Sequence, residues 1–223
     1  MRNMMPPWLR ALAERMVFLW WLKGIGTTAF MTLFFWTYFE ILKNPANPPV
    51  EVPTIAIDHW VGLTPWAYGI YVSLWVYVSL PPAFCLSFRA LMHFGLWVSA
   101  MCATCLLVFW WFPTPTPTQV IDWSQYPGLS MIKGVDAPGN ALPSLHVASA
   151  VFTAFWLHRI FGLINAPGWL RWLNATHCVA IAWSTMATLQ HVALDVLAGG
   201  LVGMLFAWAS LVAADRSRKP MHI

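Results

Sequence analysis

Six apolar stretches, each long enough to cross a bilayer as a helix, make up most of this 223-residue chain. A hydrocarbon core of about 30 Å needs about 20 apolar residues of helix, and 59% of the residues are hydrophobic whereas only 9% are charged. The stretches lie near residues 24–42, 65–84, 91–111, 145–164, 170–189 and 191–213. The sequence therefore predicts an all-α membrane protein, with six transmembrane helices in a single membrane domain over 24–213.

The two ends of the chain lie outside this predicted domain. Residues 1–23 have an apolar helical face and a charged one, and they lack the small-residue cleavage site of a signal peptide. Such a segment is typical of a helix that lies in the membrane interface. Residues 214–223 form a short basic tail, which we expect in the cytoplasm.

The distribution of basic residues predicts which side of the membrane each loop faces. Lys and Arg are enriched in cytoplasmic loops, and with six spans ten of the twelve Lys and Arg residues fall on the side of the two termini. Lys43 and Lys133 fall on the other side. We therefore expect cytoplasmic termini and outward loops at 43–64 and 112–142. The net charge of +4 then reflects topology, and no nucleic-acid partner is expected.

Two clusters of polar residues lie at the outward ends of the predicted spans, where polar groups are costly and usually functional. One is PSLH at residues 143–146, and the other joins Ser184 and Thr185 to His191 and Asp195. His191 and Asp195 are four residues apart, so on a helix they share one face. The carboxylate can accept one ring N–H and leave the other ring nitrogen free to act as a nucleophile or a base.

The PSLH cluster predicts a helix start. Ser144 is a typical N-cap residue, and the first turn of a helix offers backbone N–H groups to an anion. Together with these groups and the Ser144 hydroxyl, His146 can hold a phosphate and pass a proton to a leaving oxygen. A structural explanation stands beside this one, because a lone His at a helix end is often interfacial, and Ser or Thr in a span usually bonds a neighbouring helix.

Two other kinds of function fit the same residues. Intramembrane His and Asp side chains can carry protons in a transporter, which predicts internal repeats, and we find none in the sequence. His146, His191 and Asp195 are also metal-ligand types, and a metal site predicts loss of activity with chelators.

The paired clusters resemble two motifs of a known family. PSLH, followed about 40 residues later by SxxxxxxHxxxD, resembles the second and third motifs of the type-2 phosphatidic acid phosphatase superfamily over residues 100–213. The resemblance implies a six-helix bundle without a metal or other cofactor. For a bacterial inner-membrane member it implies an active site on the outer, periplasmic face.

The resemblance also implies a role for each residue of the site. His191 is the nucleophile that forms a phosphohistidine, and Asp195 orients it. His146 is the general acid and then the general base. Ser144 and Ser184 bind phosphate oxygens. The implied partners are a lipid phosphate drawn from the bilayer and the surrounding membrane lipids.

Two parts of the family pattern are missing. Thr185 stands where the third motif has arginine, although its hydroxyl is a further candidate for phosphate binding. The first motif, KxxxxxxRP, is absent after the third span, where the sequence reads WWFPTPTPTQ. Lys133, or else Lys43, is the outward cation that we expect to substitute in the phosphate clamp.

The missing cations leave two activities open. Arginine suits the nearly dianionic phosphomonoester best, whereas a phosphodiester carries one charge. We expect a lipid phosphate phosphatase, acting on phosphatidate, phosphatidylglycerophosphate or a polyprenyl (di)phosphate. The alternative is a head-group phosphotransferase similar to inositol-phosphorylceramide and sphingomyelin synthases.

Three glycines follow Asp195 in the last span. Gly199, Gly200 and Gly203 form a small-residue pattern that favours close packing of membrane helices. The sequence predicts that this face holds the sixth span against the fourth.

Overall fold

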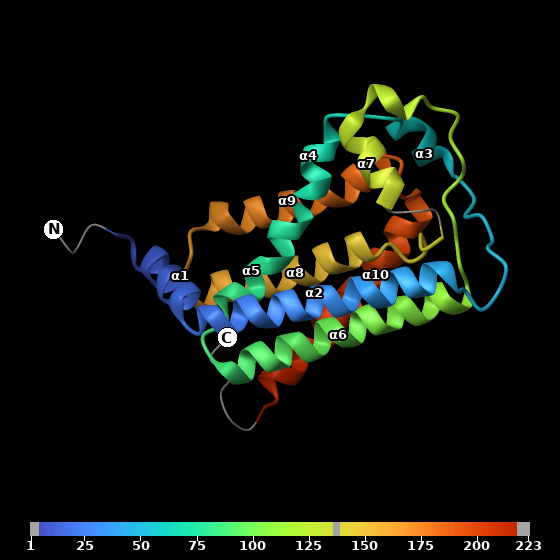
Figure 1. The fold of residues 1–223 in the computed structure, drawn as a ribbon. Coiled ribbons are helices and arrows are strands. Elements are labelled where there is room, and N and C mark those ends of the chain that lie inside the picture. The colour runs from blue at the N-terminus through green and yellow to red at the C-terminus, as the bar shows by residue number, and fades with distance from the viewer. Residues whose placement is uncertain (1–4, 136–138, 218–223) are drawn as a thin grey trace.

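Every regular element in the described part of the chain is a helix (Figure 1). The computed structural model describes residues 5–135 and 139–217, without the side chains of 132–135. In chain order the elements are α1 (Pro7–Val17), α2 (Trp20–Lys43), α3 (Ala56–Val61), α4 (Ala67–Val72), α5 (Leu74–Phe84), α6 (Phe88–Trp111), η1 (Trp123–Gln125), α7 (Pro127–Val135), α8 (Leu145–Leu163), α9 (Gly168–Ala187) and α10 (Ala193–Asp215). The prediction of an all-α protein is confirmed.

Helices occupy all six apolar stretches, but the second stretch is divided. It contains α4 and α5, which meet at Ser73. Of the described helices, α2, α6 and α10 are long and apolar enough to cross a membrane. α8 and α9 have 19 and 20 residues and do not belong to this group of span-like helices. The number of crossings and the sidedness of the termini therefore stay predictions.

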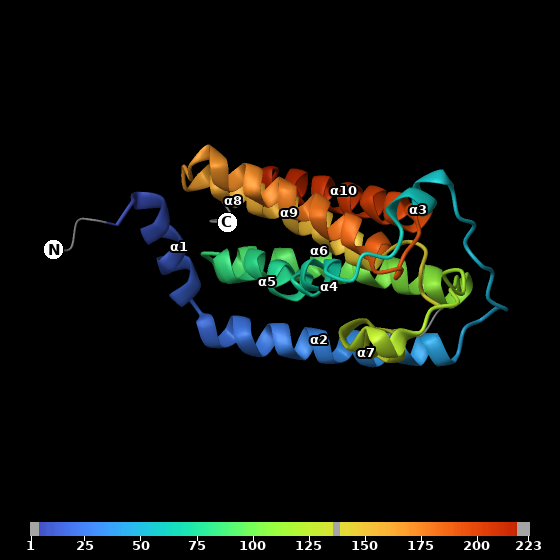
Figure 2. The ribbon, with the colours of Figure 1, turned by 90° about the horizontal axis from the view of Figure 1, so that it is seen from above.

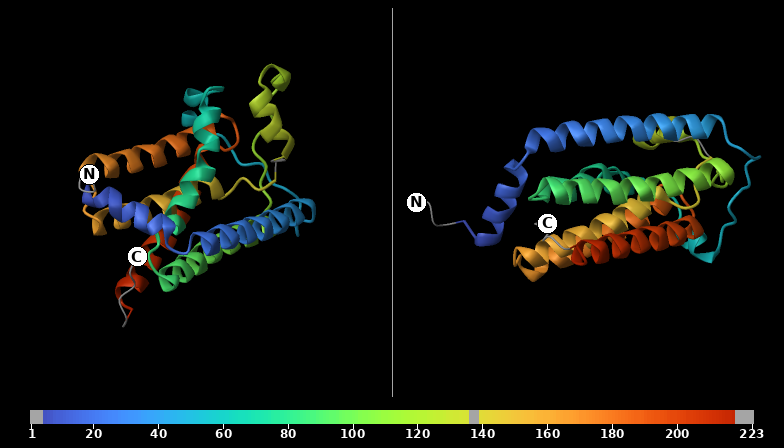
Figure 3. Two further views of the ribbon diagram at one scale, coloured as in Figure 1. Left: turned by 60° about the vertical axis from the view of Figure 1, so that its left-hand side comes forward. Right: turned by 90° about the horizontal axis from the view of Figure 1, so that it is seen from below.

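The long helices lie side by side and give the molecule two distinct ends (Figures 1 and 2). α1 and the C-terminal end of α10 lie at one of them, here called the α1 end. α3, α7 and the long connections lie at the other, here called the loop end. α8 packs against α10, α9 and α5, whereas α2 packs mainly on α6. The right-hand view of Figure 3 shows α2 on the side of α6 that faces away from α8 and α10.

The core centres on α8 and its contact with α10. Trp156 of α8 is fully buried and its indole N–H donates a hydrogen bond to Ser210 Oγ of α10 at 3.0 Å. An added Cβ at Gly199 would lie 2.2 Å from the Ser144 carbonyl oxygen, and one at Gly203 would lie 2.4 Å from the Ala148 carbonyl oxygen. The predicted glycine contact is thus present at Gly199 and Gly203. Gly200 does not take part, because a Cβ there would meet no atom within 4 Å.

A satisfied polar network joins α5, α9 and α8. The Tyr77 hydroxyl donates to Asn174 Oδ1 at 2.7 Å, and Asn174 Nδ2 donates to the Ala154 carbonyl at 2.9 Å. Where α4 meets α5, Ser73 Oγ lies 3.2 Å from Nε2 of His177. These bonds give buried polar groups the partners that an apolar interior demands.

Two basic residues fasten the α1 end. Leu19 adopts a left-handed conformation between α1 and α2. Lys23 Nζ then donates to the Arg15 carbonyl at 2.6 Å and to the Ala83 carbonyl at 2.8 Å, while Arg15 donates to the Phe84 carbonyl at 3.1 Å. Cations at the C-terminal end of α5 complement its exposed carbonyls and its dipole. That α1 lies in the membrane interface stays a prediction.

Candidate active site

The PSLH residues form the start of α8. Ser144 is the N-cap, and its Oγ accepts a hydrogen bond from the Val147 N–H at 3.3 Å. His146 consequently lies in the first turn, as the sequence predicts.

The chain that leads into α8 is held by the Pro/Thr-rich segment. Thr114 N–H donates to the Gly139 carbonyl, the Ala141 N–H donates to the Thr114 carbonyl, and the Leu142 N–H donates to Thr114 Oγ1, each at 2.8 Å. Three bonds from one residue fix the backbone just before Ser144. Sequence reasoning gave this segment no function, because its proline spacing predicts only an extended path.

His191 lies in the turn between α9 and α10, and Asp195 lies in the first turn of α10. Asp195 is fully buried, and its Oδ2 accepts hydrogen bonds from the Val192 N–H at 3.0 Å and from His191 Nδ1 at 3.4 Å. The expectation that both residues share a helix is wrong, because the left-handed Leu189 ends α9 and α10 begins only at Ala193. The expected contact is nevertheless present, since the Asp195 side chain points back past Val192, the N-cap of α10, to His191.

The two motifs meet at the loop end. The ring centroids of His146 and His191 are 6.1 Å apart, and the Ser144 N–H donates to the Asp195 carbonyl at 3.0 Å. A hydrogen on His191 Nδ1 that points to Asp195 leaves Nε2 without a proton, which is the state that a nucleophile or a base requires. At this separation one bound group can contact both rings.

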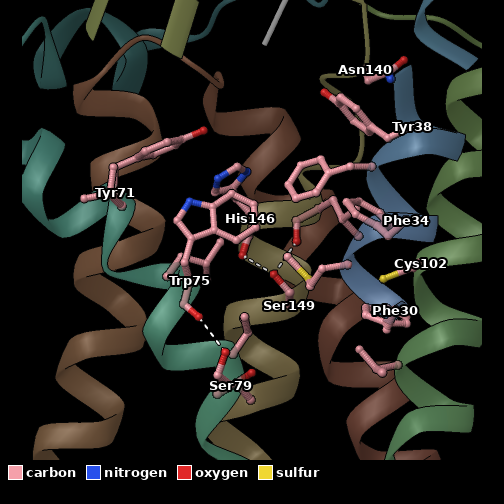
Figure 4. A pocket seen from close by; sticks show the side chains of 18 of the residues that line it. Phe30, Phe34, Tyr38, Tyr71, Trp75, Ser79, Cys102, Asn140, His146 and Ser149 are labelled. Carbon is pink, nitrogen blue, oxygen red and sulfur yellow. Dashed lines mark hydrogen bonds between the residues drawn. The ribbon is translucent and has the colours of Figure 1, made fainter. Parts of the chain in front are cut away.

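Both histidine rings line a cavity of about 640 Å³. Its wall follows α2 from Leu22 to Phe39, which is about 25 Å of helix at about 1.5 Å per residue. The cavity is therefore nearly as long as a hydrocarbon core of about 30 Å is thick. Figure 4 shows aromatic side chains of α2 on one side, α4 and α5 on the other, and His146 between them. The labelled residues of these two sides are Phe30, Phe34, Tyr38, Tyr71, Trp75 and Ser79.

Two aromatic residues hold the His146 ring. Tyr71 stacks on it with centroids 4.4 Å apart and an interplanar angle of 22°, and Trp75 meets it edge-on at 5.8 Å. Sequence reasoning missed both residues. Their i, i+4 spacing in an apolar stretch was the available signal, but it is equally typical of packing against lipid or core.

The predicted phosphate-binding hydroxyls lie behind the cavity wall. Ser144, Ser184 and Thr185 are fully buried, and none of them lines the cavity. Ser184 Oγ donates to the Ile181 carbonyl at 2.7 Å, and Thr185 Oγ1 donates to the Ala182 carbonyl at 2.8 Å. Their role in phosphate binding stays a prediction.

The expected substitute cations are not seen at the histidines. The side chain of Lys133 lies outside the described residues, and the exposed Lys43 pairs with Glu40 at 3.6 Å. Lys23 is the only Lys or Arg among the described residues that line the cavity, and it lies at the α1 end. In the same part of the chain, no three His, Cys, Asp or Glu residues are placed to hold a metal ion.

Carboxylates of the loop end accept hydrogen bonds from backbone and neighbouring groups. Asp58 of α3 accepts from the Ala193 N–H at 2.7 Å and from the Ile55 N–H at 2.8 Å. It thereby ties α3 to the first residue of α10. Hydrogen bonds, chiefly from the Ser124 side chain and also from Gln125, hold the pKa of the Asp122 carboxyl below its usual range. Sequence reasoning missed Asp58, because 135 residues separate it from its partner.

One comparison with known proteins gave a match. A family model described as PAP2 superfamily matches residues 98–219, an interval that contains both motifs. Searches of curated proteins and of solved structures each found no significant match.

Proposed function

The chain belongs to the PAP2 superfamily, whose model covers more than half of its length, and on this premise we propose that it is an integral-membrane phosphatase that hydrolyses a lipid phosphate ester. Membership and the three span-like helices support a membrane protein of phosphatase type. The observation that carries the choice of a lipid is the long apolar cavity with His146 and His191 at one end. A lipid whose phosphate lies between the two rings can extend its chain along α2.

The proposed reaction has two steps and uses three side chains. Nε2 of His191 attacks phosphorus, a P–N bond forms, the ester P–O bond breaks, and His146 gives its proton to the departing lipid oxygen. His146 then takes a proton from water, whose oxygen attacks phosphorus and breaks the P–N bond. Asp195 keeps the hydrogen of His191 on Nδ1 and stabilises the positive charge that the ring gains. Phosphate leaves, and both histidines return to their starting states.

The substrate and the sidedness are part of the proposal. Phosphatidate, phosphatidylglycerophosphate and a polyprenyl (di)phosphate all combine a phosphate ester with a long apolar chain. The excess of Lys and Arg on the side of the termini favours cytoplasmic termini. The loop end then faces the outer, periplasmic side of a bacterial plasma membrane.

The test is phosphate release by detergent-purified protein. Wild type should release inorganic phosphate from at least one of the three lipids, and His191→Ala should abolish release. His59 is an exposed histidine of α3, so His59→Ala is the matched control and should keep full activity. Full activity of His191→Ala would disprove the mechanism.

A second candidate is a lipid head-group phosphotransferase. The observation in its favour is that Lys23, far from the histidines, is the only Lys or Arg among the described cavity-lining residues, so nothing seen beside the rings selects a dianionic phosphate. In this case His146 activates the hydroxyl of an acceptor lipid in place of water. The transferase predicts transfer of a labelled head group to an added lipid alcohol, with no free phosphate.

A further inference from the structure

An anion between His146 and His191 needs hydrogen-bond donors, and three of the nearby hydroxyls, those of Ser149, Ser184 and Thr185, already donate to the protein. Ser149 Oγ donates to the Leu145 carbonyl at 2.8 Å. Ser184 and Thr185 likewise donate to carbonyls of α9. Each hydroxyl has only one hydrogen to give, so a ligand would have to break a helix contact to use it.

Asn140 carries donor hydrogens that are not used in this way. The residue is 7% exposed and lines the cavity, and Figure 4 shows it at the same end as Tyr38. Its Nδ2 is buried and has no hydrogen-bond acceptor among the described residues. The flanking residues Gly139 and Ala141 are bonded to Thr114, so the backbone of Asn140 is fixed in place.

Gln190 brings a second primary amide to the same cavity. It directly precedes His191, is 7% exposed and also lines the cavity. Its Nε2 lies 3.4 Å from the Thr188 carbonyl, which exceeds the usual N–H···O range of about 2.7–3.2 Å. One of its two donor hydrogens is engaged only weakly, and the other is available.

The buried amide of Asn174 shows what a structural role looks like in this protein. Its oxygen accepts from Tyr77 and its nitrogen donates to the Ala154 carbonyl, at 2.7 and 2.9 Å. A buried donor without an acceptor costs free energy. A buried donor without an acceptor is therefore expected where a bound ligand supplies the acceptor.

We propose that Asn140, together with Gln190, forms a neutral amide clamp that donates hydrogen bonds to the phosphate oxygens of the substrate. The identity of the anion rests on the proposed function, because the clamp lies in the cavity that both histidines share. Amide donors stabilise an oxyanion in a site from which water is excluded, and they do so without burying a further charge. Thr185 occupies the position of the arginine in the family's third motif, and the amide clamp takes over the phosphate contact of that arginine.

The experiment compares Asn140→Leu with Asn174→Leu, since both replace a buried amide by an apolar group of similar size. Loss of a hydrogen bond to a charged oxygen should lower kcat/KM of Asn140→Leu by about 10- to 100-fold. Because this variant also removes a buried unpaired donor, its Tm should equal or exceed that of wild type. Asn174→Leu should lower Tm and change kcat/KM of the folded protein by less than about twofold, since it removes two buried side-chain hydrogen bonds and leaves the Tyr77 hydroxyl only the Asn174 backbone carbonyl at 3.3 Å.

Thermal unfolding with inorganic phosphate tests the clamp without catalysis. A ligand that binds only the folded state raises Tm as its concentration rises. Phosphate should stabilise wild type and Asn174→Leu, with a much smaller effect on Asn140→Leu and Gln190→Leu. A wild type without activity but with this pattern would disprove the proposed function and leave the clamp standing.

Results for Asn140→Leu alone, or for Asn140→Leu compared with Lys133→Gln, would overturn the clamp. One is an Asn140→Leu protein with wild-type kcat/KM, or one whose activity and Tm fall together as in a merely structural change. The other is a phosphate-induced rise in Tm that is lost in Lys133→Gln and fully retained in Asn140→Leu. This result would mean that Lys133, and not the amides, binds the phosphate.

Discussion

A single methyl group at Gly199 should displace the PSLH motif from the motif that contains His191 and Asp195. The Cβ of Gly199→Ala would lie 2.2 Å from the Ser144 carbonyl oxygen and 3.1 Å from the Ser144 carbonyl carbon. Real Cβ atoms essentially never approach closer than 3.0 Å, and the obstacle here is backbone rather than a flexible side chain. The start of α8 must therefore move away from α10 by about 0.8 Å, the difference between 2.2 and 3.0 Å.

This displacement acts directly on the distance between the two rings. Ser144 precedes His146 by two residues, and Gly199 follows Asp195 by one helical turn. The His146 and His191 centroids, now 6.1 Å apart, would change their separation by a large part of the shift. A misplacement of about 1 Å can cost about 100-fold in rate, so kcat of Gly199→Ala should fall by about that factor. Overpacking should also cost about 1–3 kcal/mol of stability.

Gly200→Ala is the matched control on the same helix. A Cβ at Gly200 meets no atom within 4 Å, so this variant should keep wild-type kcat and gain about 0.5–1 kcal/mol from helix propensity. The assay is lipid phosphate release with thermal unfolding of both variants in one detergent. If Gly199→Ala stays within about twofold of Gly200→Ala in kcat, then α8 and α10 are not aligned by this contact and the reasoning fails.

Further expectations follow from the other contacts. Asp58→Ala should lower kcat several-fold, because the freed Ala193 N–H then competes with His191 for the Asp195 carboxylate. It should also lower the free energy of unfolding by about 1 kcal/mol. Asp58→Asn, measured in the same assays, should restore part of both losses. Asp195→Asn should lower kcat by at least about 100-fold. The analogous change in a serine protease triad imposes the wrong histidine tautomer and costs about 10⁴-fold. A smaller loss would mean that another group orients His191. Lys23→Met should cost about 2 kcal/mol, or about 4–8 °C in Tm, through two lost charge-assisted bonds, and an unchanged Tm would show that α1 and α5 do not depend on it. A metal chelator should leave phosphate release unchanged, and inhibition reversed by added metal would contradict the histidine mechanism.

The helices could be predicted from the sequence because the backbone of an apolar segment inside a membrane must satisfy its own hydrogen bonds. In a membrane only a helix or a closed barrel achieves this, and all six apolar stretches contain helices. The interruption of the second stretch could not be predicted. Pro81 and Pro82 are its obvious helix breakers, yet α5 continues through both. The helix is divided instead at Ser73, which bonds the Ile70 carbonyl and contacts His177 of α9.

The contacts of the site are of two kinds, those between residues close in sequence and those between residues far apart in sequence. Motif spacing was enough to predict that His191 contacts Asp195, because a carboxylate in the first turn of α10 can reach the residue just before the N-cap. Spacing could not place His191 outside α10, since this depends on a left-handed Leu189, a conformation that a leucine rarely adopts. The partners of Asp58 and the stacking of Tyr71 on His146 depend on tertiary packing, which no local pattern encodes.

The parts of the site that the family model does not match have a role of their own. The match covers 98–219, which supplies both histidines, Asp195, Asn140 and Thr114. Residues before 98 supply the α2 wall of the cavity, the Tyr71 and Trp75 side chains against His146, and Asp58 at the start of α10. In the proposed function, the matched region therefore contains the groups that react, whereas the residues before 98 shape what can reach them. It follows that substitutions on the α2 wall should change which lipid chain is accepted while the dependence on His191 remains, and that grafting this wall should transfer chain preference between members of the family.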